Sequence, residues 1–188
     1  MARPRSVDKQ NAILSAAVRT IASQGPGAAT ALIAKQAGVS NGSLFTYFET
    51  KADLLNRLYI ELKTEMAAAA LAELKVDSEL REQLLSVWTH WLRWATACPE
   101  KRRTLAHLDV SAEITPASHQ AARQTMMDIA RLLEQCREHG PMKSEPLEFM
   151  VALMNALADT TIDFMLRDPV NADHHRQTGF AALWRIVT

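Results

Sequence analysis

The stretch that most limits the possible folds of this chain is residues 30–51, TALIAKQAGVSNGSLFTYFETK. Its pattern predicts two short helices, residues 31–37 and 42–48, with a tight break at residues 38–41. Gly38 is expected to end the first helix with a positive φ, and Ser40 or Asn41 can cap the second. Apolar residues at helical spacing supply the interior of both helices: Ile33, Ala34, Ala37, Val39, Leu44 and Phe48. The segment is therefore typical of a helix-turn-helix.

A helix-turn-helix reads DNA by placing its second helix in the major groove. Asn41, Ser43 and Thr46 carry small hydrogen-bonding groups suited to that groove. The N-terminus of the helix adds partial positive charge towards phosphate. Thr30 can cap the first helix or contact backbone phosphate, and Lys51 can reach a phosphate from the start of the following helix. We expect these last two residues to position the protein rather than to read sequence.

A net charge of zero hides an uneven distribution along the chain. Residues 1–51 hold six Lys and Arg against two Asp and Glu, a net charge of +4, whereas residues 52–188 hold fifteen against nineteen, a net charge of −4. A basic N-terminal part suits an anionic partner such as DNA. Arg3 and Arg5, on either side of Pro4, form a short basic arm that can enter the minor groove or can equally be a terminus that contacts nothing.

The rest of the chain has helical periodicity and lacks the alternation typical of strands. A helix is predicted before the helix-turn-helix, over residues 7–22, and a capping box at residues 50–53 predicts the start of a long helix. The predicted helices, about nine, cover residues 7–22, 31–37, 42–48, 51–74, 78–98, 101–108, 115–140, 147–166 and 171–188. We expect an all-α fold with a three-helix DNA-binding domain at residues 1–50 and a larger helical ligand-binding and dimerisation domain at residues 51–188.

The last two predicted helices are expected to form a homodimer. Residues 147–166 are apolar on more than one face, so this helix must be covered on several sides. The final helix adds a further apolar set: Phe180, Leu183, Trp184 and Ile186. Two copies of this pair can meet in a two-fold, four-helix interface.

Three of the four tryptophans, Trp88, Trp91 and Trp94, lie within seven residues. They can be plain core packing or an aromatic wall around a cavity for a flat ligand. Met154 belongs to a group of methionines that would suit an adaptable cavity, although methionine at helical spacing is more often part of the core.

No catalytic or metal-binding motif is recognisable in the sequence. The glycines, at positions 25, 27, 38, 42, 140 and 179, form neither GxSxG, GxGxxG nor a P-loop. No two of the six histidines are three or four residues apart, so no helix face presents a pair of metal ligands. We therefore expect no catalytic residue, no metal and no cofactor.

The cysteines and the apolar runs predict where the protein works. Cys98 and Cys136 have no paired spacing, which favours two reduced thiols in a cytoplasmic protein. No apolar run approaches the roughly 18 residues of a membrane span, and the N-terminus lacks the apolar core of a signal peptide. We expect a cytoplasmic protein without membrane contact.

The first third of the chain resembles the N-terminal domain of the TetR family of transcriptional repressors. The resemblance is carried by Thr30, Ile33-Ala34, Ala37-Gly38-Val39-Ser40, Gly42-Ser43-Leu44, Tyr47-Phe48, Lys51 and Leu54. It implies DNA contacts from the basic arm and from the helix-turn-helix: Arg3, Arg5, Thr30, Ser40, Asn41, Gly42, Ser43, Thr46, Tyr47 and Lys51. The family commonly has Tyr, whose hydroxyl contacts phosphate, where this chain has Phe45, so that contact is not carried over.

A narrower similarity is to a RamR-type branch, whose members repress genes tied to multidrug efflux and bind diverse drugs. It is carried by MARPRS, Tyr59, the tryptophan-rich segment at residues 88–94, and ALADTTIDF followed by RDP. The resemblance implies a small, aromatic or amphiphilic inducer. The residues expected to bind it are Tyr59, Trp88, Trp91 and Met154.

The main hypothesis is a homodimeric repressor on a palindromic operator in double-stranded DNA, released by a small-molecule inducer. Its two recognition helices would lie about 34 Å apart, one turn of DNA. A ligand that prefers another spacing would shift the population away from the DNA-competent state. The alternative is a small-molecule-binding protein or enzyme that keeps the helix-turn-helix only as a scaffold. Salt-sensitive, sequence-selective DNA binding separates the two hypotheses.

Overall fold

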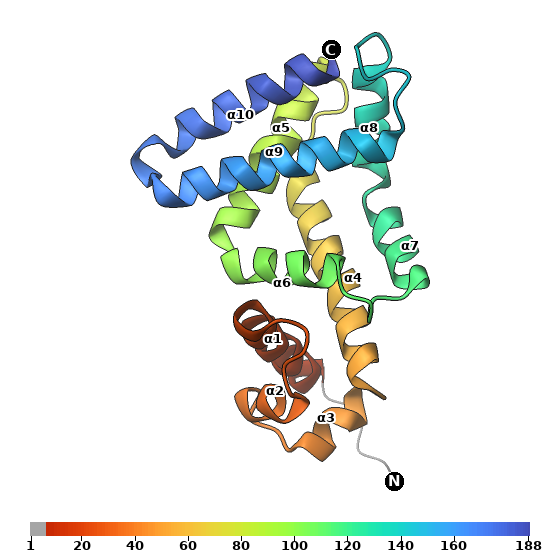
Figure 1. Ribbon diagram of the computed structural model, residues 1–188, viewed down its shortest axis with the longest axis vertical. Helices are drawn as coiled ribbons and strands as arrows, with labels where there is room; N and C mark the ends of the chain where they lie inside the picture. Colours follow the sequence, from red (N-terminus) through yellow and green to blue (C-terminus); the bar gives the residue numbers. More distant parts are fainter. Residues whose placement is uncertain (1–6) are drawn as a thin grey trace. The chain divides into compact units, whose positions relative to one another are not determined.

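The structure, a computed structural model, describes residues 7–188, and all of its regular elements in that range are helical (Figure 1). The elements are α1 (Val7–Gln24), α2 (Thr30–Gln36), α3 (Asn41–Tyr47), α4 (Lys51–Leu71), α5 (Leu80–Ala97), α6 (Pro99–Asp109), α7 (Pro116–Thr125), α8 (Met127–Arg137), α9 (Leu147–Arg167), the short 3-10 helix η1 (Pro169–Asn171) and α10 (Ala172–Val187). The predicted all-α fold is confirmed.

The ten α-helices of residues 7–188 exceed the predicted number by one, because residues 115–140 form two helices instead of one. Met126 separates α7 from α8 with φ −97° and ψ 4°, a bridge-region conformation that interrupts the helix. The Ala130 amide then donates to the Met126 carbonyl, 2.9 Å away, and α8 continues from there. Neither glycine nor proline marks this break, so helical periodicity could not predict it.

The chain packs into two compact units. The first contains residues up to Thr64 together with Cys98–Gln124, and the second contains Glu65–Ala97 together with Thr125–Thr188. The first unit therefore includes α6 and most of α7 in addition to the N-terminal helices. The predicted boundary at residue 50 separates a DNA-binding domain from a ligand-binding and dimerisation domain. It is a division by function, and it stays a prediction.

Helix α1 forms the core of the first unit together with α2 and α6, which both pack against it (Figure 1). Ile13 and Ile21 of α1 are fully buried, and burying such a side chain contributes roughly 1.5–3 kcal/mol. Two buried threonines add directional contacts. The Thr104 hydroxyl donates to the Val18 carbonyl at 2.9 Å, and the Thr20 hydroxyl lies 3.0 Å from Gln36 Oε1. The three helices are thereby held in one arrangement.

The start of α4 confirms one of the two bonds of the predicted capping box. The Asp53 amide donates to Thr50 Oγ1 at 3.0 Å, and the Asp53 carboxylate accepts from the Glu49 amide at 3.0 Å. The return bond reaches Glu49 rather than Thr50, one residue further from the helix. The first bond satisfies an amide that the helix start would otherwise leave unpaired, and the second fixes the residue before the N-cap.

In the second unit, α9 and α10 run side by side and α5 packs against both (Figure 1). Gly179 permits the close approach, since a Cβ at this position would overlap the Thr161 side chain and lie 3.1 Å from Trp88 Cζ2. Trp88 is 1% exposed, and its indole Nε1 donates to the Arg176 carbonyl at 3.0 Å. A large ring on α5 is therefore fitted to the smallest residue on α10.

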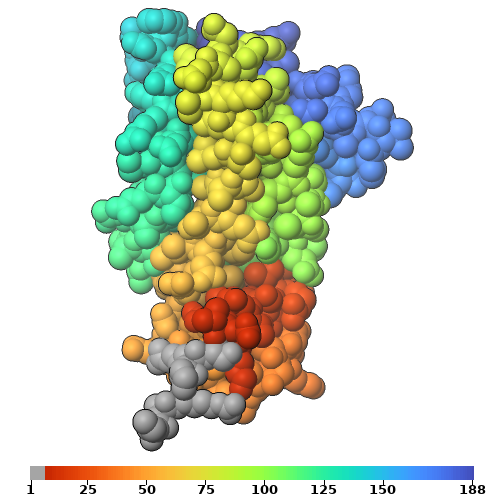
Figure 2. Space-filling view, turned by 180° about the vertical axis from the view of Figure 1, so that it is seen from behind, coloured from red at the N-terminus to blue at the C-terminus, as the bar shows by residue number. Residues whose placement is uncertain are grey.

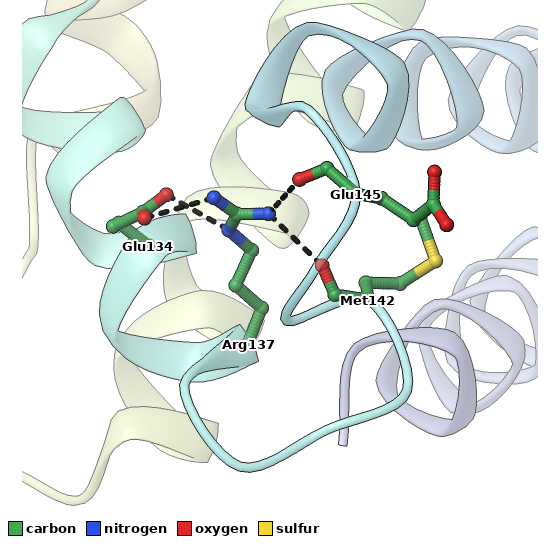
Figure 3. Close-up of polar contacts among 4 residues, drawn as sticks. All are labelled: Glu134, Arg137, Met142 and Glu145. Atoms are coloured by element: carbon green, nitrogen blue, oxygen red, sulfur yellow. Dashed lines mark hydrogen bonds and ion pairs between the residues drawn. The ribbon is translucent and has the colours of Figure 1, made fainter.

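The loop between α8 and α9 is held by Arg137, whose contacts are drawn in Figure 3. Its Nε and one terminal nitrogen each donate to the Glu134 carboxylate at 2.8 Å. The other terminal nitrogen donates to the carbonyls of Met142, at 2.9 Å, and Glu145. These bonds to Arg137 hold the pKa of the Glu134 carboxyl below its ordinary value. One guanidinium thus satisfies two loop carbonyls that have no helix to pair with.

Helix α9 is long and apolar enough, by length and composition, to cross a membrane, which the sequence reading did not predict. It is nevertheless a core helix, because one of its faces is buried in the second unit: Met150, Met154, Ala158, Thr161, Ile162 and Met165. The opposite face leaves Phe149 and Phe164 each 49% exposed. Figures 1 and 2 show from two sides that the linked ends of α9 and α10 extend beyond α5 within this unit.

Candidate nucleic-acid interface

The break between α2 and α3 has the geometry of a Schellman motif centred on Gly38. Gly38 has φ +70°, in the left-handed region that favours glycine. Its amide donates to the Lys35 carbonyl at 3.2 Å, and the Val39 amide donates to the Ala34 carbonyl at 3.0 Å. The predicted positive φ at Gly38 is confirmed, and the carbonyls of Ala34 and Lys35 near the end of α2 are satisfied.

Ser40 is the residue that caps α3. It has extended backbone angles, φ −72° and ψ 154°, and its Oγ accepts from the Ser43 amide at 3.0 Å. The prediction that Thr30 caps the preceding helix is wrong, because α2 begins one residue earlier than expected. Ala29 occupies the N-cap position instead, and Thr30 lies inside the first turn, half-exposed.

The two helices bury one side each and leave α3 with one open face. Leu44 and Phe48 are buried beneath α3, and α2 contributes Ile33 and Ala34 to the same interior. Successive residues are rotated by about 100° around a helix, so the side opposite Leu44 is centred between positions 42 and 46. The exposed face of α3 consists of Asn41, Gly42, Phe45 and Thr46.

The predicted DNA contacts on α3 differ in their exposure to solvent. Asn41 and Thr46 are exposed, and the Thr46 hydroxyl donates to the Gly42 carbonyl at 3.3 Å. Ser43 and Tyr47 lie at the edges of the exposed face and are half-exposed. Phe45, which is 41% exposed, was not among the predicted contacts although it lies one turn after Asn41. The signal that could have found it is its spacing of four from Asn41.

The last three predicted contacts are Lys51, Arg3 and Arg5. Lys51 is half-exposed at the first position of α4. Arg3 and Arg5 lie outside the described residues.

Tyr59, one of the predicted ligand contacts, is in the first unit and is 3% exposed. Its hydroxyl donates to Asp109 at 2.9 Å and lies 3.2 Å from His119 Nδ1. Lys63 Nζ is 3.0 Å from the Asp109 carboxylate and 5.5 Å from the centre of the Tyr59 ring. Burial, and then the neighbouring negative charge of Asp109, raise the pKa of Tyr59 above its ordinary value. The side chain is a neutral phenol that links α4 to α6.

The other predicted ligand contacts, Trp88, Trp91 and Met154, are in the second unit. Trp88 and Met154 are buried, whereas Trp91 is half-buried and meets the Trp88 ring edge-on, with ring centres 6.2 Å apart. Trp94 is also buried, and its Nε1 donates to Glu65 at 3.0 Å. Trp88 and Trp94 therefore serve the core, and Trp91 is the tryptophan of this group with accessible ring surface.

Residues 7–188 contain no cluster of three or more side chains that could hold a metal ion. Both cysteines are free thiols. Cys136 is buried, and burial raises its pKa to about 11.

Comparison with known proteins identifies the family. The sequence pattern of the "Bacterial regulatory proteins, tetR family" matches residues 13–58. A solved structure of a protein assigned to the TetR family of transcription regulators, from Shewanella sp. PV-4, is 30% identical over 94% of this chain and 96% of that chain, with a TM-score of 0.83. The chain belongs to the TetR family. A TetR family regulator from Marinobacter aquaeolei VT8 is 26% identical, covers 99% of this chain and 98% of that chain, and has a TM-score of 0.85.

Family membership settles the broad function. TetR-family proteins are DNA-binding transcription regulators with a helix-turn-helix and are not enzymes, so the hypothesis that the helix-turn-helix is only a scaffold for an enzyme is set aside. The TetR family regulator LfrR from Mycobacterium smegmatis, solved in complex with proflavine, is 20% identical over 96% of this chain and 98% of that chain, with a TM-score of 0.69. At that identity the likeness shows the shared fold.

The Tyr59 hydrogen bond to Asp109 should contribute less to the free energy of unfolding at alkaline pH. Tyr59→Phe should lower the free energy of unfolding by about 1 kcal/mol at neutral pH, since it removes a buried hydrogen bond to Asp109. Because the native state holds the Tyr59 proton more tightly than the unfolded chain, this contribution is complete below the ordinary pKa of 10.0 and declines above it. Urea denaturation at a series of pH values should show the gap between the two proteins narrowing as the pH rises past about 10. A gap that widens would contradict the assigned hydrogen bond.

Proposed function

We propose that this TetR-family regulator is a homodimeric repressor that binds a palindromic operator and leaves it when a small molecule binds. The observation that carries the DNA-binding part is the geometry at Gly38 and Ser40, which fixes α3 with Asn41 and Thr46 exposed on one face. Amide and hydroxyl groups on such a face are suited to base edges in the major groove. Around it, the half-exposed Lys51 is suited to phosphate.

The proposed interface has further contacts besides Asn41, Thr46 and Lys51. The set is Arg3 and Arg5 in the N-terminal arm, Thr30 at the start of α2, Ser40, Gly42 and Ser43 at the start of α3, and Tyr47 at its end. Most of these groups are short and uncharged, so they suit contacts with sugar and phosphate that fix the register of the protein on DNA.

The proposed homodimer is formed by α9 and α10. On the exposed side of α9, Phe149 and Phe164 flank three small exposed residues: Ala152, Ala156 and Thr160. Small residues between two aromatic rings allow another helix to approach closely while the rings bury apolar area. A symmetric dimer would bury the same surface on each copy.

The proposed inducer is a small aromatic or amphiphilic molecule, in keeping with the RamR-type resemblance at Tyr59 and residues 88–94. LfrR binds proflavine, a flat aromatic molecule, which is consistent with this class. The proposed ligand contacts are Tyr59, Trp88, Trp91 and Met154, and among them Trp91 presents accessible ring surface. A ligand that binds one spacing of the recognition helices better than another shifts the population towards that spacing. Bound DNA then lowers the affinity for the ligand by the same factor by which the ligand lowers the affinity for DNA.

The proposed location is the cytoplasm, where the operator is. Free thiols at Cys98 and Cys136 are consistent with a reducing compartment. The proposed regulator needs no membrane contact.

The proposed reading face predicts two different effects on DNA binding. Genomic fragments retained by the natural protein at fixed salt would first supply the operator, and absence of sequence-selective, salt-sensitive retention would refute operator binding. Lys51→Ala should weaken binding to all DNA sequences about equally, because it removes a phosphate contact. The slope of log affinity against log salt concentration should fall in magnitude by about one. Asn41→Ala should relax base preference at one operator position. Lys75→Ala, an exposed lysine in the loop before α5, is the matched control and should change neither quantity.

The proposed dimer surface predicts that a charge on α9 separates the copies. Phe164→Asp places a carboxylate where apolar area would be buried, so the dimer should dissociate at concentrations where the natural protein stays paired. Sedimentation equilibrium measures the dissociation constant, and circular dichroism checks that the helices remain. Val76→Asp, at a 71% exposed valine between α4 and α5, should leave the dimer intact. Unchanged association of Phe164→Asp would move the interface elsewhere.

The proposed inducer class predicts that proflavine lowers operator affinity. Fluorescence anisotropy of labelled operator measures the loss as proflavine is added. Trp91→Ala should reduce proflavine affinity about tenfold, since it removes an aromatic stacking surface. Val76→Ala, which shortens an exposed apolar side chain between α4 and α5, is the control and should respond like the natural protein. If proflavine never releases the operator, this inducer class is wrong; if Trp91→Ala responds normally, Trp91 is not a ligand contact.

A further inference from the structure

The exposed face of α3 contains a large apolar side chain that the fold does not use. Phe45 is 41% exposed, whereas Leu44 and Phe48 fill the interior beneath the helix. It lies one turn after Asn41, so the two side chains are neighbours on the same face. A single exposed apolar residue is common on protein surfaces and would carry no inference alone.

Gly42, on the same face, supplies a second and independent observation. Among residues 7–188 only Gly25 and Gly38 have positive φ, so the backbone at position 42 does not require glycine. Packing does not require it either, because a Cβ there would meet no atom nearer than Ser40 Oγ at 4.0 Å. Glycine is disfavoured in helices relative to alanine. The fold would accept alanine at this position, so the missing side chain leaves a gap that the chain itself does not fill.

The gap and the ring lie next to one another. Gly42 precedes Phe45 by three residues and Thr46 by four, which places it one turn below both on the exposed face. The gap therefore has the Phe45 ring and the Thr46 side chain above it and Asn41 beside it. Ser40 Oγ, 4.0 Å away, is the one atom within 4 Å of a Cβ placed there, so the apolar side of the gap is the Phe45 ring. A phenyl ring offers no hydrogen bond to a polar group placed against it.

The chemistry of base edges selects one occupant for this place. In the major groove, guanine, cytosine and adenine present donors and acceptors, while thymine also presents an apolar C5-methyl group. Donors or acceptors pressed against a phenyl ring would lose water without gaining a partner, whereas a methyl group gains by leaving water. We propose that Phe45 and the gap at Gly42 form an apolar subsite for the C5-methyl group of one thymine in each operator half-site. This inference rests on the proposed operator binding.

The experiment uses the full-length protein and removes only the methyl group. An operator is selected from random duplexes by the natural protein, and each thymine is then replaced in turn by deoxyuridine, which keeps the pairing with adenine. Affinities are measured at one fixed salt concentration. At one position per half-site the natural protein should bind about fourfold more weakly, the effect expected for losing one buried methyl group. Replacement in both half-sites should weaken binding about sixteenfold.

The decisive comparison is with Phe45→Ala. This variant should bind the thymine and deoxyuridine operators equally well at that position, while Phe45→Leu, which keeps an apolar side chain, should retain part of the preference. Val110→Ala shortens another exposed apolar side chain, 86% exposed at the end of α6, and should keep the full preference. Thermal unfolding of each variant shows that the loss is not a loss of structure.

Gly42→Ala gives a readout that a structural role would not produce. The added methyl group should leave the melting temperature unchanged or higher, yet weaken operator binding at least tenfold because it occupies the place of the thymine methyl group. A lower melting temperature with unchanged DNA affinity would contradict the subsite.

The outcomes separate the two proposals. If the natural protein selects an operator but no thymine shows a methyl effect that Phe45→Ala abolishes, the subsite is wrong and operator binding stands; Phe45 would then contact sugar or nothing. If no operator is selected at all, operator binding fails and the subsite fails with it.

Discussion

The left-handed backbone at Gly38 is the constraint on which the DNA-binding surface depends. With φ +70° at this residue, the chain turns out of α2 while two amides satisfy the carbonyls of Ala34 and Lys35. Ser40 then caps α3 two residues later. Since both ends of the break are hydrogen-bonded, the direction of α3 is set by local bonds, and the burial of Leu44 and Phe48 sets its rotation. The exposure of Asn41 and Phe45 follows from those two settings rather than from any contact of their own.

The sequence predicted this part of the fold well because the interactions that form it join residues close together in the chain. A glycine with positive φ, a serine cap and a capping box at residues 50–53 each act within five residues of sequence. Thr30 was misassigned because α2 begins one residue earlier than expected, and hydroxyl residues are plausible caps at neighbouring positions. The break at Met126 was missed for the opposite reason, since no local breaker causes it.

The tryptophan-rich segment shows what the sequence could not decide. Helical spacing left Trp88 equally suited to a core and to a ligand cavity. The packing against α10 depends on Gly179, ninety-one positions away, and on the Arg176 carbonyl that accepts from the indole. Such long-range fitting has no signature in one sequence, so the burial of Trp88 and the accessibility of Trp91 emerge only from the three-dimensional arrangement. Phe45 differs, because its four-residue spacing from Asn41 is a local pattern that places it on the same face of α3.

The composition of α3 separates affinity from specificity in the proposed complex. The helix, NGSLFTY, has no charged side chain, so it cannot supply the salt-dependent attraction that dominates binding to the DNA backbone. That attraction has to come from cations outside α3, such as Lys35 at the end of α2 and Lys51 at the start of α4. Asn41 and Thr46 carry no charge, so they gain little from phosphate and depend on fitting base edges. Sequence preference should therefore survive changes of salt that weaken binding overall, because the two properties reside in different residues.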